Sequence, residues 1–239
     1  TGRTTRLLRD RTEAWITSPG APHELADGSF VMSSERTGRT HLYRYDREGT
    51  LLNAVTTGEL DVSRIQHVDE AAGRILFTAR LGGPVRTHLF AAPLDGSSSP
   101  ERLTRETGSH RVSVSPDGAM FTDAWSSFEH PTRVALRDAA GDLVRVLDDN
   151  PVPDLDRWDV GTVRHERIEI AGETLDATIQ LPPGFDPGRR HPVWVMTYGG
   201  PGYPSVRMGW WGRRTWDHVL AAAGIVVFRT DPYPASGQG

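Results

Sequence analysis

A glycine-rich loop carries the residues with the clearest chemical potential. It reads Thr197-Tyr198-Gly199-Gly200-Pro201-Gly202 and directly follows the apolar run Val193–Met196. Because Gly199 and Gly200 have no Cβ, they can bring main-chain N–H groups close to a substrate oxygen, and the Tyr198 hydroxyl is a further donor. Such donors stabilise the negative charge that develops on an attacked carbonyl oxygen. The loop therefore predicts one half of an oxyanion hole.

No nucleophile motif for acyl transfer accompanies this loop in the sequence. There is no G-x-S-x-G nucleophile elbow, and without cysteine there is no thiol nucleophile, disulfide or zinc-thiolate site. Ser205 and Ser236 lie in glycine-rich loops without such an elbow, so we interpret them as ordinary loop serines. The nine histidines form no H-E-x-x-H motif or other close ligand pair, so we expect no metal site and no cofactor.

Aromatic and acidic residues near the loop have structural as well as functional interpretations. Tyr198 by itself is equally consistent with a strand-end aromatic that packs locally. Asp231 follows an apolar run at a position that suits a site, yet aspartate before proline commonly starts a turn, and both interpretations stay open. For Trp210, Trp211 and Trp216, at the expected start of a helix, we predict packing rather than a substrate cleft.

The elements around the loop indicate a mixed sheet. Residues 167–181 are typical of a hairpin with one polar face. The runs Val193–Met196 and Ile225–Phe228 are continuously apolar, which predicts strands buried on both faces. Residues 215–223 favour a helix that Gly224 would end. Hairpin, strand, helix, strand is the opening order of an α/β-hydrolase sheet, and ligands of open α/β sheets bind beyond the carboxyl ends of the strands.

Residues 1 to about 150 repeat with a period of about 45 residues. Two sets of turn glycines mark the period, Gly28, Gly73 and Gly118 in one set and Gly49, Gly96 and Gly141 in the other. The segments between them alternate apolar and polar residues as strands do. Units of this length with some four short strands predict β-propeller blades, which bury both faces only between neighbours, and about three are present. An irregular antiparallel sandwich is the alternative.

The fold class predicted from these patterns is multidomain, β plus α/β: a partial β-propeller followed by the N-terminal part of an α/β-hydrolase sheet. The acidic, proline-rich stretch at 148–154 is typical of a linker. We therefore expect propeller blades over residues 1–155 and the beginning of a hydrolase domain over residues 156–239, truncated before the nucleophile. The start without Met and the end after a strand-like run predict a piece of a longer protein.

Composition excludes some partners. With a net charge of −4 the chain has no broad positive field, so we expect neither nucleic acid nor an acidic membrane surface as a partner. All 27 basic residues are arginine, a bias typical of a GC-rich bacterial genome. The longest apolar run, 219–228, is short of the roughly 20 residues that span a bilayer, so no membrane-spanning segment is expected. The sequence does not indicate a compartment, and homo-oligomerisation stays open.

Several segments in collinear order carry a family resemblance. They include Ser33–Tyr43, Ser115–Gly118, Val146–Pro151, Leu181–Asp186 and Tyr198–Pro201. They resemble the last blades and the start of the hydrolase domain in dipeptidyl peptidase IV-type enzymes of the prolyl oligopeptidase group, and the likeness as a whole extends over nearly the whole chain. The resemblance implies a serine peptidase whose propeller caps the active site and restricts access to short peptides.

The resemblance also implies roles. Tyr198 matches the tyrosine of the Tyr-x-Gly-Pro motif, which donates to the oxyanion. The reaction would be cleavage of a short peptide near its amino terminus through an acyl-enzyme. The Ser-Asp-His triad and the glutamates that bind the substrate amino terminus would lie outside this sequence, so the fragment alone is expected to be inactive.

One motif departs from the family pattern. The second apolar run is followed by Asp231-Pro232-Tyr233-Pro234, whereas the family usually has Asp-x-Arg-Gly there. A divergent or inactive parent protein therefore stays open. A propeller binding or scaffold protein with a degenerate hydrolase tail is also consistent with the sequence, and so is an acylaminoacyl or oligopeptidase relative.

Overall fold

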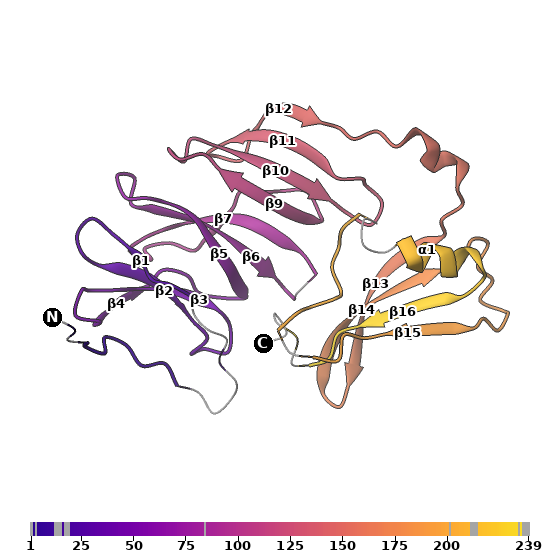
Figure 1. Cartoon of the computed structure of the whole chain (residues 1–239), viewed down its shortest axis with the longest axis horizontal. Helices are drawn as coiled ribbons and strands as arrows, with labels where there is room; N and C mark the ends of the chain where they lie inside the picture. The colour runs from indigo at the N-terminus through magenta and orange to yellow at the C-terminus, as the bar shows by residue number, and fades with distance from the viewer. Residues whose placement is uncertain are drawn as a thin grey trace.

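The protein is built from four sheets of four strands each. The computed structural model describes residues 2, 4–11, 16, 20–83, 85–200, 202–210, 215–233 and 235. Within these residues three sheets are antiparallel and lie side by side in chain order, and a mixed sheet follows them (Figure 1). This arrangement confirms the predicted fold class, a partial β-propeller followed by the N-terminal part of an α/β-hydrolase sheet. Pro201, Trp211 and Ser236 lie outside the described residues.

The antiparallel sheets are the three blades that the repeat predicted. The first blade contains β1 (His23–Glu24), β2 (Phe30–Ser34), β3 (His41–Tyr45) and β4 (Leu51–Ala54). The second contains β5 (Leu60–Asp69), β6 (Arg74–Leu81), β7 (Thr87–Pro93) and β8 (Glu101–Arg102). The third contains β9 (Ser109–Val114), β10 (Met120–Ser126), β11 (Arg133–Asp138) and β12 (Leu143–Asp148). Neighbouring strands are consecutive in each blade, so every connection within a blade is a hairpin.

The core lies between the blades. In β6 alternate side chains point to opposite faces, so Ile75 and Phe77 pack with Leu42 of the first blade, whereas Leu76 packs with Phe121 of the third. All five side chains are at most 1% exposed. The second blade is therefore buried on both faces, as the propeller interpretation requires.

Both sets of turn glycines lie where one strand of a blade turns into the next. Gly28, Gly73 and Gly118 precede the second strand of their blades, and Gly49, Gly96 and Gly141 precede the fourth. All six have positive φ, a region that side chains with a Cβ disfavour. The second set has a further constraint. A Cβ at Gly96 would collide with the carbonyl oxygen of Ala54, in the last strand of the preceding blade, and a Cβ at Gly141 would collide with that of Leu103.

This packing predicts a large cost for a methyl group at Gly96. We expect Gly96→Ala to lower the free energy of unfolding by about 2–4 kcal/mol, because the positive φ and the contact with Ala54 both disfavour it. Gly38→Ala is the matched control, since Gly38 also has positive φ but open space around it, and should cost about 1 kcal/mol. Urea unfolding measures both changes. Equal losses would show that the contact between blades is unimportant.

Two histidines repeat from the first blade to the second. The His41 Nδ1 lies 3.1 Å from the Thr56 Oγ1, and the His88 Nδ1 lies 3.0 Å from the Thr104 Oγ1. Each threonine oxygen also accepts from the backbone N–H of the residue after the histidine, here Leu42 in the first blade. In each of the two blades, this pair connects the third strand to the residues that directly follow the fourth strand. The spacing of the nine histidines had not indicated the repeat.

Burial lowers the pKa of His88 to about 4, with a further contribution from the nearby His110. In the unfolded chain this imidazole is protonated as the pH falls through about 6.5, whereas in the folded chain it stays neutral down to about pH 4. The folded state is therefore fully stable with respect to this group above pH 6.5 and loses stability as the pH falls towards 4. We expect this group to remove about 1–2 kcal/mol of stability between about pH 7 and pH 5. Urea unfolding of His88→Gln, which cannot titrate, should show a correspondingly smaller loss over this range. The exposed His23→Gln is the control and should behave like the wild type.

The mixed sheet follows the third blade after the short 3-10 helix η1 (Pro153–Arg157). Its elements are β13 (Thr162–Ile170), β14 (Glu173–Leu181), β15 (Val193–Met196), α1 (Thr215–Ala222) and β16 (Val226–Thr230). The order is β13-β14-β16-β15, with β14 antiparallel and β15 parallel to β16. The predicted hairpin, strand, helix and strand are therefore confirmed. Gly224 has a φ of +83° and its N–H bonds the Ala221 carbonyl, so it ends α1 as expected.

The predicted burial of β15 on both faces is wrong. Val193, Trp194 and Val195 are 49–63% exposed, because β15 is the edge strand of the described sheet and only β16 pairs with it. β16 is central but only partly buried. The packing predicted for Trp216 is also wrong, since this side chain on α1 is 60% exposed.

The tip of the hairpin between β6 and β7 contacts the mixed sheet. The Arg167 guanidinium of β13 donates to the Gly82 carbonyl, and a Cβ at Gly83 would lie 2.8 Å from the Asp176 carboxylate of β14. The Asp176 carboxylate in turn lies 2.5 Å from the His165 Nε2. The second blade and the sheet are thus joined by polar contacts.

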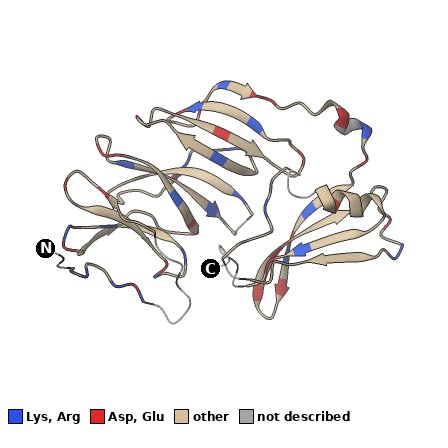
Figure 2. Ribbon diagram, viewed as in Figure 1, with Lys and Arg blue, Asp and Glu red and all other residues tan. Residues whose placement is uncertain are grey.

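Charged residues of both signs are scattered over the blades and the mixed sheet (Figure 2). In the view of Figure 2 they do not gather into a face of one sign, which agrees with the small net charge. Within the part of the chain that is described, no helix is long and apolar enough to cross a membrane.

Candidate functional site

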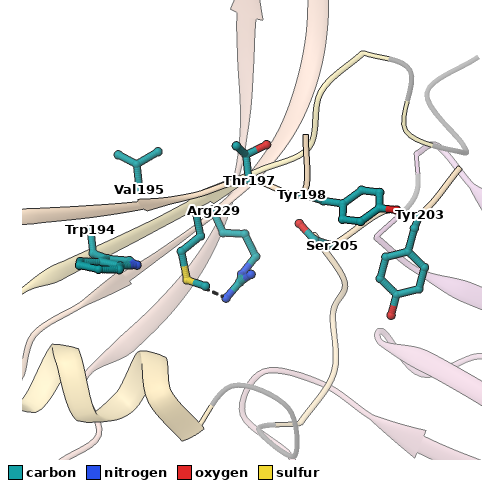
Figure 3. Close-up of a pocket in the computed structure, with 8 residues that line it drawn as sticks. Trp194, Val195, Thr197, Tyr198, Tyr203, Ser205 and Arg229 are labelled. Atoms are coloured by element: carbon teal, nitrogen blue, oxygen red, sulfur yellow. Dashed lines mark hydrogen bonds between the residues drawn. The ribbon is translucent and has the colours of Figure 1, made fainter. Parts of the chain in front are cut away.

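A pocket of about 450 Å³ lies at the carboxyl end of β15 (Figure 3). Its lining residues are Trp194, Val195, Met196, Thr197, Tyr198, Tyr203, Ser205 and Arg229. The pocket therefore combines the end of β15, the glycine-rich loop, the segment after that loop and the end of β16. It lies at the edge of the sheet where ligands of α/β sheets bind.

Tyr198 lies two residues beyond the carboxyl end of β15 and is 54% exposed. Its ring folds back over Gly200, where a Cβ would lie only 2.9 Å from the ring. Gly199 has a φ of +72°. The two glycines therefore have different functions: Gly199 supplies an unusual backbone angle, and Gly200 leaves room for the tyrosine ring. The phenol remains accessible beside the pocket.

Tyr203 and Ser205 form the wall of the pocket on the same side as Tyr198 (Figure 3). The rings of Tyr198 and Tyr203 meet edge to face, with centroids 5.8 Å apart. The Ser205 hydroxyl donates to the Asp231 carboxylate at 2.5 Å, so this serine is held by a carboxylate. Asp231 itself directly follows β16 and is fully buried.

The opposite side of the pocket carries a paired charge. The guanidinium of Arg229 donates to the Asp217 carboxylate at 2.8 Å and lies 3.2 Å from the Met196 sulfur. Asp217 is in the first turn of α1 and 4% exposed, so this pair joins the helix to the end of β16. Because the two charges compensate each other, the pocket itself is close to neutral and its walls are mainly aromatic and apolar.

A second cluster of ligand-type groups lies in the third blade. Oxygen and nitrogen atoms of Glu106, His110 and Asp123 lie within 4.8 Å of one another. The Arg137 guanidinium, however, donates to Asp123 at 3.0 Å and also to Glu106. The His110 Nδ1 lies 2.9 Å from Asp123 and its Nε2 lies 2.9 Å from the Glu106 carbonyl. A guanidinium already provides the positive charge that a metal would supply, so we interpret the cluster as a salt-bridge network.

The structure brings Tyr198, Ser205 and Asp231 to one region, although the sequence indicated no part in the site for Ser205. Asp231 precedes a turn in which the Ala235 N–H donates to the Pro232 carbonyl, as the turn interpretation predicted. In addition, its carboxylate accepts from the Ser205 N–H, in a loop far away in the sequence. Tyr203 and Arg229 were missed. Their signals were weak, because Tyr203 lies in an irregular segment and Arg229 is inside an otherwise apolar strand.

Blades of a β-propeller joined to a mixed α/β sheet define a class of two-part proteins, and comparison with known proteins identifies the family. The sequence pattern of the dipeptidyl peptidase IV N-terminal region matches residues 1–132, more than half of the chain. The chain belongs to the dipeptidyl peptidase IV family. This finding confirms the resemblance drawn from its motifs.

Individual relatives agree. The chain is 26% identical over 211 residues to a dipeptidyl peptidase 4 of Trichophyton equinum, covering 84% of this chain and 27% of that protein. It is 32% identical over 192 residues to a probable dipeptidyl-aminopeptidase B of Emericella nidulans, covering 74% and 20%. The crystal structure of Porphyromonas gingivalis dipeptidyl peptidase 4 superposes with a TM-score of 0.82 at 28% identity, covering 92% of this chain and 31% of that one. The chain thus spans less than a third of the length of these proteins.

Proposed function

We propose that this chain is part of a serine exopeptidase that cleaves short peptides near the amino terminus through an acyl-enzyme. Residues 1–155 would be the last blades of its propeller, and residues 156–239 the beginning of its α/β-hydrolase catalytic domain. Membership of the dipeptidyl peptidase IV family supports the peptidase class. The use of arginine for all 27 basic residues supports a bacterial source.

The observation that carries the proposal is the location of Tyr198. Its side chain is accessible beyond the carboxyl end of β15, beside a pocket, in a loop where Gly199 has a positive φ and Gly200 leaves room for the tyrosine ring. In the proposed reaction a serine outside this sequence attacks the peptide carbonyl, and the negative charge moves to the carbonyl oxygen. The Tyr198 O–H donates to that oxygen and stabilises the transition state.

The 239-residue chain alone is proposed to be inactive. Acyl transfer requires a nucleophile, its base and the oxyanion donors in one constellation, and only a donor is assigned here. The sequence contains no G-x-S-x-G elbow that would expose a serine above the sheet.

The test uses the complete parent protein. We expect a fluorophosphonate probe to label it at a serine, and we expect it to release 4-nitroaniline from dipeptidyl substrates with a free amino terminus. Hydrolysis of acetylated substrates instead would favour an acylaminoacyl peptidase. A scaffold protein is favoured by the Asp231-Pro232-Tyr233 departure. Peptide binding without any labelling would select the scaffold function and reject the peptidase proposal.

A further inference from the structure

The buried carboxylate of Asp231 collects hydrogen bonds from one short segment. It accepts from the Ser205 N–H at 2.7 Å, from the Ser205 hydroxyl at 2.5 Å and from the Val206 N–H at 2.8 Å. Asp231 and Val206 are both 0% exposed. Buried backbone N–H groups without an acceptor are costly, so these bonds hold residues 205–206 against the end of β16.

The same segment continues upstream to the tyrosine pair. Tyr203 lies two residues before Ser205, and its ring meets the Tyr198 ring edge to face. The Arg207 guanidinium lies 4.6 Å from the centre of the Tyr203 ring, and its Nε donates to the Pro204 carbonyl at 3.0 Å. Residues 203–207 therefore make close local contacts on either side of Ser205, which Asp231 binds. Within this segment Tyr203 packs against one side of Tyr198.

Downstream, the segment is held by the propeller. The Met208 N–H donates to the Val85 carbonyl at 2.9 Å, and the Trp210 N–H donates to the Ser126 hydroxyl at 3.2 Å. Val206 and Met208 also pack with Val85. Figure 1 shows this stretch leaving the mixed sheet towards the third blade. Held at both ends, residues 203–210 form a wall of fixed position rather than a loose loop.

We propose that Asp231 is a positioning residue for Tyr198, acting through Ser205 and Tyr203. The inference rests on the proposed function, since it assigns Asp231 to the positioning of the oxyanion donor. A carboxylate is required because all three of its partners donate. The amide of asparagine would present an N–H group to at least one of these donors, although its shape is the same.

The first test is a double-mutant cycle in the complete parent protein. We expect Asp231→Asn to lower kcat by about tenfold or more with little change in KM, because it affects a group that acts in the transition state. In a Tyr198→Phe background the same change should have almost no further effect. Asp186→Asn is the matched control, an exposed aspartate whose carboxylate accepts a local bond from the Gly188 N–H, and should leave kcat unchanged. An equal loss in both backgrounds would overturn the proposal.

The second test does not depend on activity. The parent protein is labelled with 3-fluorotyrosine, and the ¹⁹F resonance of Tyr198 is assigned by its loss in Tyr198→Phe. We expect this resonance to shift in Asp231→Asn and in the milder Ser205→Ala, which removes only the hydroxyl donor, but not in Asp186→Asn. A resonance unchanged in both variants refutes the positioning role even if the protein proves not to be a peptidase. If the resonance shifts but the protein has no peptidase activity, the positioning role is retained and only the proposed function is rejected.

Discussion

Replacing Tyr198 with phenylalanine in the complete parent protein is expected to lower kcat by about two to three orders of magnitude. The change removes one hydroxyl group and keeps the ring that packs on Gly200 and Tyr203. Loss of a single oxyanion donor in a hydrolase has this size because the donor acts where the charge develops. Steady-state kinetics with a dipeptidyl 4-nitroanilide measures it, and KM should change little.

The control for this prediction is another exposed tyrosine that follows a strand of the mixed sheet. Tyr233 is 53% exposed, close to the 54% of Tyr198, and follows β16 rather than β15. Tyr233→Phe removes the same group and should leave kcat within about twofold. A Tyr198→Phe protein with wild-type turnover would contradict the oxyanion role and leave Tyr198 as a packing residue.

The second large effect is expected in the third blade, where Asp123→Ala should lower the free energy of unfolding by about 3–5 kcal/mol. The Asp123 side chain is 0% exposed and accepts from Arg137 at 3.0 Å, and its other oxygen lies 2.9 Å from the His110 ring. Removing it leaves a guanidinium, only 9% exposed, without its buried partner. Urea unfolding measures the loss.

An exposed ion pair, Asp142 with Arg105, is the control that distinguishes the effect of burial from the effect of charge. Asp142 lies 2.9 Å from Arg105, but both side chains are more than 60% exposed. Asp142→Ala should therefore cost less than about 1 kcal/mol, since water screens such a pair. If Asp123→Ala were as mild as this control, the network around Arg137 would contribute little to the stability of the blade.

The sequence predicted the blades well because their signals are local. Each turn glycine needs a positive φ, which depends on the turn itself, and the alternation in segments such as β6 depends on neighbouring residues. The hairpin of β13 and β14 and the end of α1 at Gly224 were predicted for the same reason. The position of Tyr198 after a strand also followed from local order alone.

The remaining features depend on partners far apart in the chain. Asp231 binds Ser205 across 26 residues, and Arg137 binds Glu106 across 31. No local pattern specifies such pairs. The exposure of β15 was mispredicted because an apolar run encodes a preference for burial, whereas actual burial requires a neighbouring strand and covering helices. Tyr203 was missed because a single aromatic in an irregular segment has no periodicity.

The close fit of the turn glycines has a consequence for how such proteins diverge. At Gly96 and Gly141 one blade meets the next through main-chain atoms, whose shape is the same whatever side chains surround them. Substitutions elsewhere in the blades can then accumulate over evolution without changing how the blades stack, provided these few positions stay glycine. A backbone that superposes with a TM-score of 0.82 at only 28% sequence identity agrees with this reasoning.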